Sequence, residues 1–162
     1  MHVKLENLAL KTVARQMPEA IVLADKEGRI TWVNPAFEEL CGYTLSEVRG
    51  KHPGRILQGK GTDPQTAKAF RVAVKQGLEI DDDILNYHKD GCSYWARVSI
   101  TPLRGATGVL QGFIAIERDV TDEHENLEEL HGEVVELYSA LLYEEQPKGR
   151  RIKSDDPFYR KN

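Results

Sequence analysis

Three segments of β-type sequence, joined by short turns, constrain the fold more than any other feature. They lie at residues 79–88, 93–103 and 110–118. The turns between them contain Gly91 and Gly108 and are only a few residues long. Connections this short join neighbouring strands that run antiparallel, so the three segments predict an antiparallel meander.

An earlier part of the chain predicts two more strands. Residues 21–24 are apolar, residues 29–33 alternate in character, and the turn between them ends in Gly28. This pattern is typical of a β-hairpin. Asn34 and Pro35 then end the second strand, because proline cannot donate to a strand ladder. The chain therefore predicts an α+β fold with a five-stranded antiparallel sheet.

Helical patterns surround these strands. Residues 2–16 repeat apolar side chains on one face, and residues 36–41 form a short helix before Gly42. A longer helix is predicted to begin at Asp63, as its N-cap, and Pro64, and to end at Gly77. We expect short helices on one face of the sheet, with further helices at both ends of the chain.

The C-terminal helix carries a heptad pattern. Its a and d positions are Val120, Leu127, Leu130, Val134, Leu137 and Leu141, with position 123 as the exception. Such a face either pairs with a second copy in a coiled coil or packs on the sheet of the same chain. The predicted organisation is an N-terminal cap helix at 1–17, a central domain at 18–120, an amphipathic helix at 121–145 and a basic, disordered tail at 146–162.

Composition narrows the class of protein. The 162 residues are 40% hydrophobic and 30% charged, which is typical of a globular protein. No run approaches the ~20 apolar residues that span a bilayer, and no signal peptide opens the chain, so we expect a cytoplasmic protein. The tail carries six basic and two acidic side chains, which leaves residues 1–145 with a net charge of −8. An acidic body argues against nucleic acid as a partner.

The chain shows no catalytic constellation. It lacks a P-loop, a supported Ser-His-Asp set and a metal-spaced cluster of His and Cys. Cys41 and Cys92 form no CxxC pair. We therefore predict no enzyme and no metal site, and we expect output through association with itself or with a separate effector.

Two arginines point to an anionic ligand. Arg55 and Arg71 lie sixteen residues apart, with Gln58 between them, in a stretch rich in Gly and Pro. A guanidinium group offers paired donors in a planar fork, which suits phosphate. The alternative is that both are solvated surface arginines.

Several motifs together resemble a known family. They are Asn34-Pro35-Ala36-Phe37, Arg55-Ile56-Leu57-Gln58-Gly59, Asn86-Tyr87, Lys89-Asp90-Gly91 and Tyr94-Trp95. With these motifs, the chain resembles a PAS domain, and more narrowly the light-oxygen-voltage (LOV) branch, from about residue 18 to residue 123. The resemblance implies the PAS fold and a flavin cofactor, FMN, with FAD as the alternative.

The resemblance also implies roles for particular residues. Arg55 and Arg71 would hold the flavin phosphate, Gln58 the ribityl chain or phosphate end, and Asn86 the pyrimidine edge of the ring. The expected cofactor-binding set is completed by Gly54, Leu57, Phe70, Ala96 and Glu117.

Three of these positions depart from the LOV pattern. Gly54 stands where the family has its photoreactive cysteine, so a cysteinyl–flavin adduct cannot form there. Ala96 replaces an asparagine that bonds the ring. Glu117 replaces the glutamine near flavin N5, and it is either protonated beside the ring or ionised and turned toward solvent, Arg118 or Arg97.

The resemblance therefore implies a blue-light or redox sensor that signals through flavin reduction and rearrangement of terminal helices in a homodimer. The alternative is a ligand-free PAS interaction module. A haem sensor would need an axial histidine, for which His52 and His88 are the candidates, although a surface or loop position is favoured for both.

Overall fold

The structure of the protein is a computed structural model that describes residues 2–144. The chain divides into two compact units, one that ends at Asp122 and one that begins at Glu123. Each unit is described on its own. The predicted basic tail at residues 146–162 lies outside the described residues.

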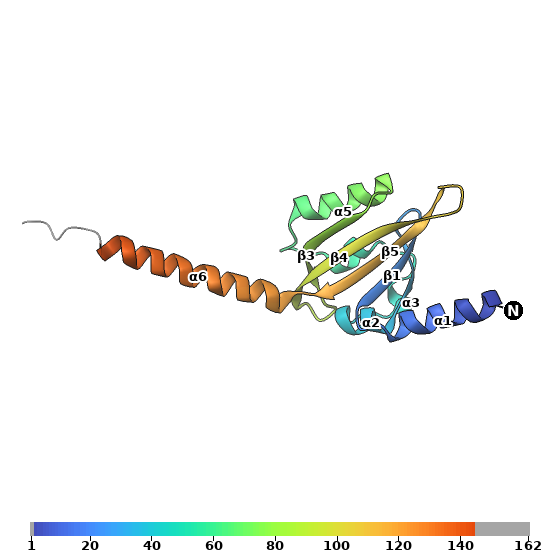
Figure 1. The fold of residues 1–162 in the computed structure, drawn as a ribbon, viewed down its shortest axis with the longest axis horizontal. Coiled ribbons are helices and arrows are strands. Elements are labelled where there is room, and N and C mark those ends of the chain that lie inside the picture. The colour runs from blue at the N-terminus through green and yellow to red at the C-terminus, as the bar shows by residue number, and fades with distance from the viewer. Residues whose placement is uncertain (1, 145–162) are drawn as a thin grey trace, which may run out of the picture. The chain divides into compact units, whose positions relative to one another are not determined.

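The first unit is built on one antiparallel sheet with the strand order β2-β1-β5-β4-β3 (Figure 1). The strands are β1 (Ala20–Asp25), β2 (Ile30–Val33), β3 (Ile80–Tyr87), β4 (Ser93–Arg104) and β5 (Leu110–Asp119). The last three strands are neighbours in the sheet, as their short turns predict. The predicted α+β fold with five antiparallel strands is confirmed.

The turn between β1 and β2 has two local causes. Asp25 Oδ1 accepts hydrogen bonds from the backbone N–H groups of Glu27 and Arg29, at 3.0 and 2.8 Å. Gly28 has φ of 81°, a left-handed conformation that glycine adopts without strain. A Cβ at Gly28 would lie 2.8 Å from Val74 Cγ1, so glycine also lets the hairpin approach the helix that carries Val74.

Four helices separate β2 from β3. They are α2 (Pro35–Cys41), α3 (Leu45–Val48), α4 (Pro53–Leu57) and α5 (Pro64–Gln76). The predicted limits of α5 are correct, because Asp63 Oδ2 accepts a bond of 2.7 Å from the N–H of Thr66, and Gly77 ends the helix with φ of 65°. α2 contacts β1 and α5 contacts β3.

Asn34 joins three elements at the start of α2. Its Oδ1 accepts hydrogen bonds from the N–H groups of Ile21 and Phe37, at 2.8 and 3.1 Å. Its Nδ2 donates to the carbonyls of Ala14 and Glu19, at 3.0 and 2.9 Å. The side chain has no exposed area. These four bonds satisfy a buried amide fully, and they connect the N-terminal helix, β1 and α2.

The hydrophobic core lies between the sheet and the helices. Its side chains that are less than 2% exposed include Phe37, Ile30, Val22, Val48 and Cys41. Together with their neighbours on β3 and β4, they form one cluster. Burial on this scale stabilises the fold by roughly 25 cal/mol for each Å² of apolar surface removed from water.

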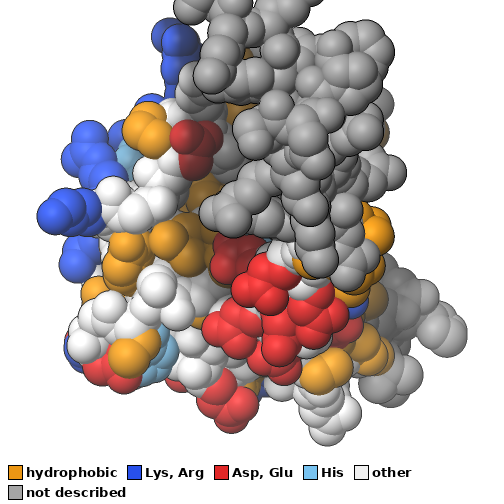
Figure 2. Space-filling view, turned by 90° about the vertical axis from the view of Figure 1, so that its left-hand side faces the viewer, with side chains coloured by type: hydrophobic (Ala, Val, Ile, Leu, Met, Phe, Trp, Pro, Cys, Tyr) orange, Lys and Arg blue, Asp and Glu red, His pale blue; other side chains and the backbone are white. Residues whose placement is uncertain are grey.

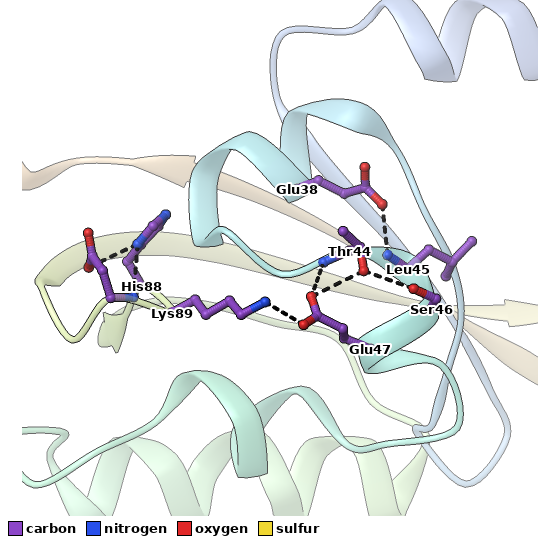
Figure 3. A network of polar contacts seen from close by, with 8 residues as sticks. Glu38, Thr44, Leu45, Ser46, Glu47, His88 and Lys89 are labelled. Atoms are coloured by element: carbon purple, nitrogen blue, oxygen red, sulfur yellow. Dashed lines mark hydrogen bonds and ion pairs between the residues drawn. The ribbon is translucent and has the colours of Figure 1, made fainter.

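A polar network connects α3 to the turn between β3 and β4 (Figure 3). Lys89 bonds to Glu47, whose other oxygen accepts a bond of 2.9 Å from the N–H of Thr44. The hydrogen bond from Lys89 lowers the pKa of Glu47 to about 2. Nearby, Glu38 Oε1 accepts a bond of 2.7 Å from the N–H of Leu45. The network therefore holds the α2–α3 connection against the β3–β4 hairpin.

Helices are present at both ends of the described chain. They are α1 (His2–Gln16), in the first unit, and α6 (Thr121–Glu144), which continues into the second. On α1, Leu10 and Val13 are 67% and 57% exposed. The predicted a and d positions of α6 from Leu127 to Leu141 are 54–65% exposed. No helix in the described part of the chain is both long enough and apolar enough to cross a membrane.

Candidate functional site

A cavity of about 680 Å³ lies between the sheet and the helices α4 and α5. Sites for small molecules commonly have about 300–1,000 Å³. One wall is the helix-facing side of the sheet, with side chains from β1, β3, β4 and β5. The other wall consists of α4, α5 and the β1–β2 turn. The Gly- and Pro-rich stretch, the helix that follows it and four strands of the sheet therefore contribute to this cavity.

Most of the lining is apolar. Leu57 and Phe70 face the cavity from the helical side and are 2% and 7% exposed. The sheet contributes Val22, Ile84, Val98, Ile100, Phe113 and Ala115. Apolar walls on both sides suit a flat aromatic ring system, because stacking against them removes both of its faces from water.

Exposed cationic side chains line part of the cavity, together with the exposed carboxylate of Glu27. Arg55 from α4 and Arg71 from α5 line the cavity and are exposed, and Gln58 between them is half-buried. Neither guanidinium forms an ion pair with another residue between 2 and 144. Lys75, one helical turn after Arg71, also lines the cavity. Figure 2 shows lysine and arginine side chains gathered at the left-hand edge of the face in view, beside exposed hydrophobic side chains.

Two buried polar side chains lie inside the cavity. Asn86 on β3 and Glu117 on β5 are each 3% exposed and line its inner wall. Glu117 Oε2 has no hydrogen-bond partner among the described residues. Burial raises the pKa of Glu117 to about 7. The structure agrees with the inward alternative for Glu117, since Arg97 instead pairs with Asp83 at 2.7 Å.

Tyr94 and Cys41 lie near this carboxyl group. Tyr94 on β4 lies opposite Asn86 on β3 in the strand register. The buried hydroxyl of Tyr94 has no hydrogen-bond partner within the described chain. Burial, and then the charge of Glu117, raise the pKa of Tyr94. Burial raises the pKa of the Cys41 thiol to about 11, so Cys41 stays a neutral thiol, and its sulfur donates to the carbonyl of Phe37.

Gly54 also lines the cavity, within α4. A Cβ at this position would lie 2.9 Å from the Nε2 atom of Gln58, at the end of a flexible side chain. Ala96 is the one predicted site residue that does not line the cavity. It is fully buried in the core.

The structure separates the two candidate histidines. His52 is half-buried and lines the cavity directly before α4, whereas His88 lies in the β3–β4 hairpin beside Asp90. Between residues 2 and 144, no group of three or more His, Cys, Asp or Glu side chains could hold a metal ion.

Comparison with known proteins agrees with this geometry. Residues 18–122 match the family model described as PAS domain. A solved structure described as the LOV domain of the blue-light activated histidine kinase of Erythrobacter litoralis EL346 is 30% identical, with a TM-score of 0.61. The match covers 65% of this chain and 99% of that one. The chain belongs to the PAS domain family, in its light-oxygen-voltage branch.

Other proteins are similar to a large part of the chain. The blue-light-activated histidine kinases of Brucella abortus and Brucella anthropi are 44% and 39% identical over 104 residues, which are 64% of this chain. The chain spans about one fifth of the length of these relatives, since 21% of each is covered. An RNA-binding LOV receptor is 32% identical with a TM-score of 0.69, over 76% of this chain and 36% of that one.

Sequence reasoning missed several residues in and near the cavity. Tyr94, which is not part of the cavity lining, shares a strand face with Ala96 and Val98, so strand alternation could have placed it inward. Lys75 lies four residues after Arg71 on α5, and that spacing could have placed both on one face. Lys26 lines the cavity from the β1–β2 turn, and we find no local signal that places it there. Sequence reasoning considers His52 only as a haem-ligand candidate, and it lines the same cavity.

Proposed function

We propose that the cavity binds a phosphorylated flavin and that the protein is a flavin-based sensor of blue light or redox state. One observation carries this proposal. A single apolar cavity joins two exposed arginines at its opening to two buried polar groups, Asn86 and Glu117, at its inner wall. A flavin has the same distribution of groups, with an anionic tail, an apolar tricycle and a polar ring edge.

Each end of the cavity has a distinct role in this proposal. Arg55 and Arg71 hold the phosphate through charge-assisted hydrogen bonds, and Gln58 bonds the chain between phosphate and ring. Asn86 offers both a donor and an acceptor to the imide edge of the ring. The phosphate, the chain and the ring that these residues would bind are present both in FMN and in the FMN half of FAD, so either flavin satisfies the proposed contacts.

Glu117 is the proposed switching residue. When bound, the flavin supplies a ring that absorbs blue light and accepts electrons and protons. With a pKa near 7, Glu117 can hold or release a proton at the cavity wall around neutral pH. A change in its protonation alters the hydrogen bonds at β5. Since Gly54 carries no thiol, the response does not use a cysteine bond.

Glu117 and the start of α6 are only four residues apart in the chain, and hydrogen bonds join the segment between them. Two residues after Glu117, Asp119 Oδ1 accepts hydrogen bonds from the N–H and hydroxyl of Thr121, at 2.9 and 2.6 Å. The Thr121 hydroxyl oxygen in turn accepts a bond of 3.0 Å from the N–H of Trp95 on β4. We propose that α6 then moves relative to a partner helix in a homodimer, because its heptad face is exposed.

A ligand-free PAS interaction module is the second candidate. The exposed apolar side chains of α1 and α6 favour it, because they offer a dimerisation surface whether or not the cavity is filled. The prediction that nucleic acid is not a partner stays a prediction, since one structural neighbour is described as RNA-binding.

Titration of the purified chain with FMN tests the flavin proposal. We expect saturable binding with a shifted and structured flavin absorption band, since the ring leaves water for an apolar wall. Replacing both arginines with glutamine, Arg55→Gln with Arg71→Gln, is expected to weaken FMN binding while riboflavin binding stays unchanged. An absence of saturable binding by FMN and by riboflavin would favour the interaction module instead.

A further inference from the structure

A second hollow adjoins the flavin cavity. It has a volume of about 700 Å³ and is lined by Arg29, Tyr43, Gly50, Lys51, His52, Arg55 and Ile56. Two of these residues, His52 and Arg55, also line the flavin cavity. The two spaces therefore share part of a wall, which includes the arginine that the proposed function assigns to the flavin phosphate.

The lining of the second hollow is basic and aromatic. Arg29, Lys51 and Arg55 are exposed cations, and none of its lining residues is acidic in the part of the chain that the structure describes. Arg29 also forms an ion pair with a carboxylate outside the hollow, with 3.7 Å between Arg29 Nη1 and Asp25 Oδ2. Tyr43 contributes an aromatic ring, with Lys89 Nζ 5.7 Å from the ring centre. Cations next to an aromatic ring suit a phosphate joined to a planar base.

Backbone pairing holds the wall of the second hollow in place. The N–H of Ile30 donates to the carbonyl of Lys51 at 2.9 Å, and the N–H of Gly50 donates to the carbonyl of Ile30 at 2.8 Å. The segment that carries Lys51 is thus fixed to the start of β2. A site built on such paired backbone needs little ordering when a ligand binds.

We propose that the second hollow binds the adenylate half of FAD. This inference rests on the proposed function, because it requires the flavin half to occupy the first cavity. Arg55 then lies between the two phosphates, Lys51 faces the outer phosphate, and the adenine stacks on Tyr43. FMN fills the first cavity only and makes none of the contacts to Tyr43 and Lys51.

Calorimetric titration of the full chain with riboflavin, FMN and FAD tests the proposal. We expect FAD to bind about tenfold more tightly than FMN, since one base stack and one further cation contribute. Tyr43→Leu and Lys51→Met are each expected to remove most of that advantage while changing the FMN affinity less than about twofold. Lys68→Met, at an exposed lysine of α5 that lines neither space, is the matched control and is expected to change neither affinity.

Each other outcome overturns the proposal. Equal affinities for FMN and FAD would leave the flavin site intact but remove the role of the second hollow. The same conclusion follows if Tyr43→Leu and Lys51→Met weaken FMN and FAD equally, or change neither. If AMP binds the FMN-loaded protein while FAD has no advantage over FMN, the hollow takes a free adenylate instead. If neither riboflavin nor any phosphorylated flavin binds, the proposed function fails together with this inference.

Discussion

Replacing Glu117 with glutamine changes the pH dependence of folding in a defined direction. Glu117 is 3% exposed, and one of its oxygens lacks a partner among the described residues. Burial raises its pKa from 4.5 to about 7. The native chain therefore binds a proton at Glu117 that the unfolded chain has already released. By linkage, wild-type stability falls as the pH rises from 4.5 to 7 and is constant above that range with respect to this group.

The expected size of this change in stability follows from the difference between the two pKa values of Glu117. At about 1.4 kcal/mol for each pH unit, the free energy of unfolding loses about 3 kcal/mol through Glu117 between pH 4.5 and pH 7. Glutamine has the same shape and cannot ionise, so Glu117→Gln does not show this loss. The difference in stability between the variant and the wild type should grow by about 3 kcal/mol over this range, in favour of the variant.

Urea unfolding at several pH values between about 4.5 and 8 measures this difference. Glu79→Gln, at an exposed glutamate just before β3, is the matched control and should follow the wild-type profile. If the profiles of Glu117→Gln and wild type run parallel throughout, Glu117 is ionised at neutral pH in the folded state. The argument from burial would then be wrong, and so would its proposed role as a proton-holding switch.

Three further predictions address other parts of the molecule. Arg71→Gln should weaken FMN binding about tenfold or more and leave riboflavin binding unchanged, because one charged hydrogen-bonding group is lost; equal loss for both flavins in calorimetry would contradict this. Leu130→Glu should convert a homodimer to a monomer in sedimentation experiments, whereas Glu129→Gln on the same helix should not; an unchanged mass for Leu130→Glu would exclude the heptad face as the interface. Asn34→Ala should reduce the free energy of unfolding by about 3 kcal/mol in urea, because four backbone groups lose their side-chain partner; a loss below about 1 kcal/mol would contradict the role assigned to those bonds.

Local chemistry explains why much of the fold could be predicted. The β1–β2 turn and the start of α5 depend on the nearby side chains of Asp25 and Asp63, and the end of α5 depends on the left-handed backbone of Gly77. Short turns likewise determine that β3, β4 and β5 are neighbours. The place of the hairpin beside β5 has no such local cause, because it depends on how the two parts of the sheet pack together.

The candidate site was predictable only in part, for a similar reason. Resemblance located the two arginines, Asn86 and Glu117, but alternation along β5 could not say whether Glu117 faces the core or solvent. That choice depends on register, since Glu117 lies opposite Ala20 and Val98, both on the buried face. His52 enters the cavity through the packing of α4 against the hairpin, which depends on contacts between distant parts of the chain.

Illumination of a Gly54→Cys variant loaded with FMN tests the central claim most directly. The claim is that a flavin ring lies beside α4, next to Gly54. A thiol at this position requires a small movement of the Gln58 side chain, which is flexible. The account predicts that light removes the blue absorption band of Gly54→Cys and that the band returns in the dark, while Gly54→Ser keeps its band under the same brief exposure. If Gly54→Cys binds FMN and its band does not respond, the ring does not lie beside Gly54 and the account is contradicted.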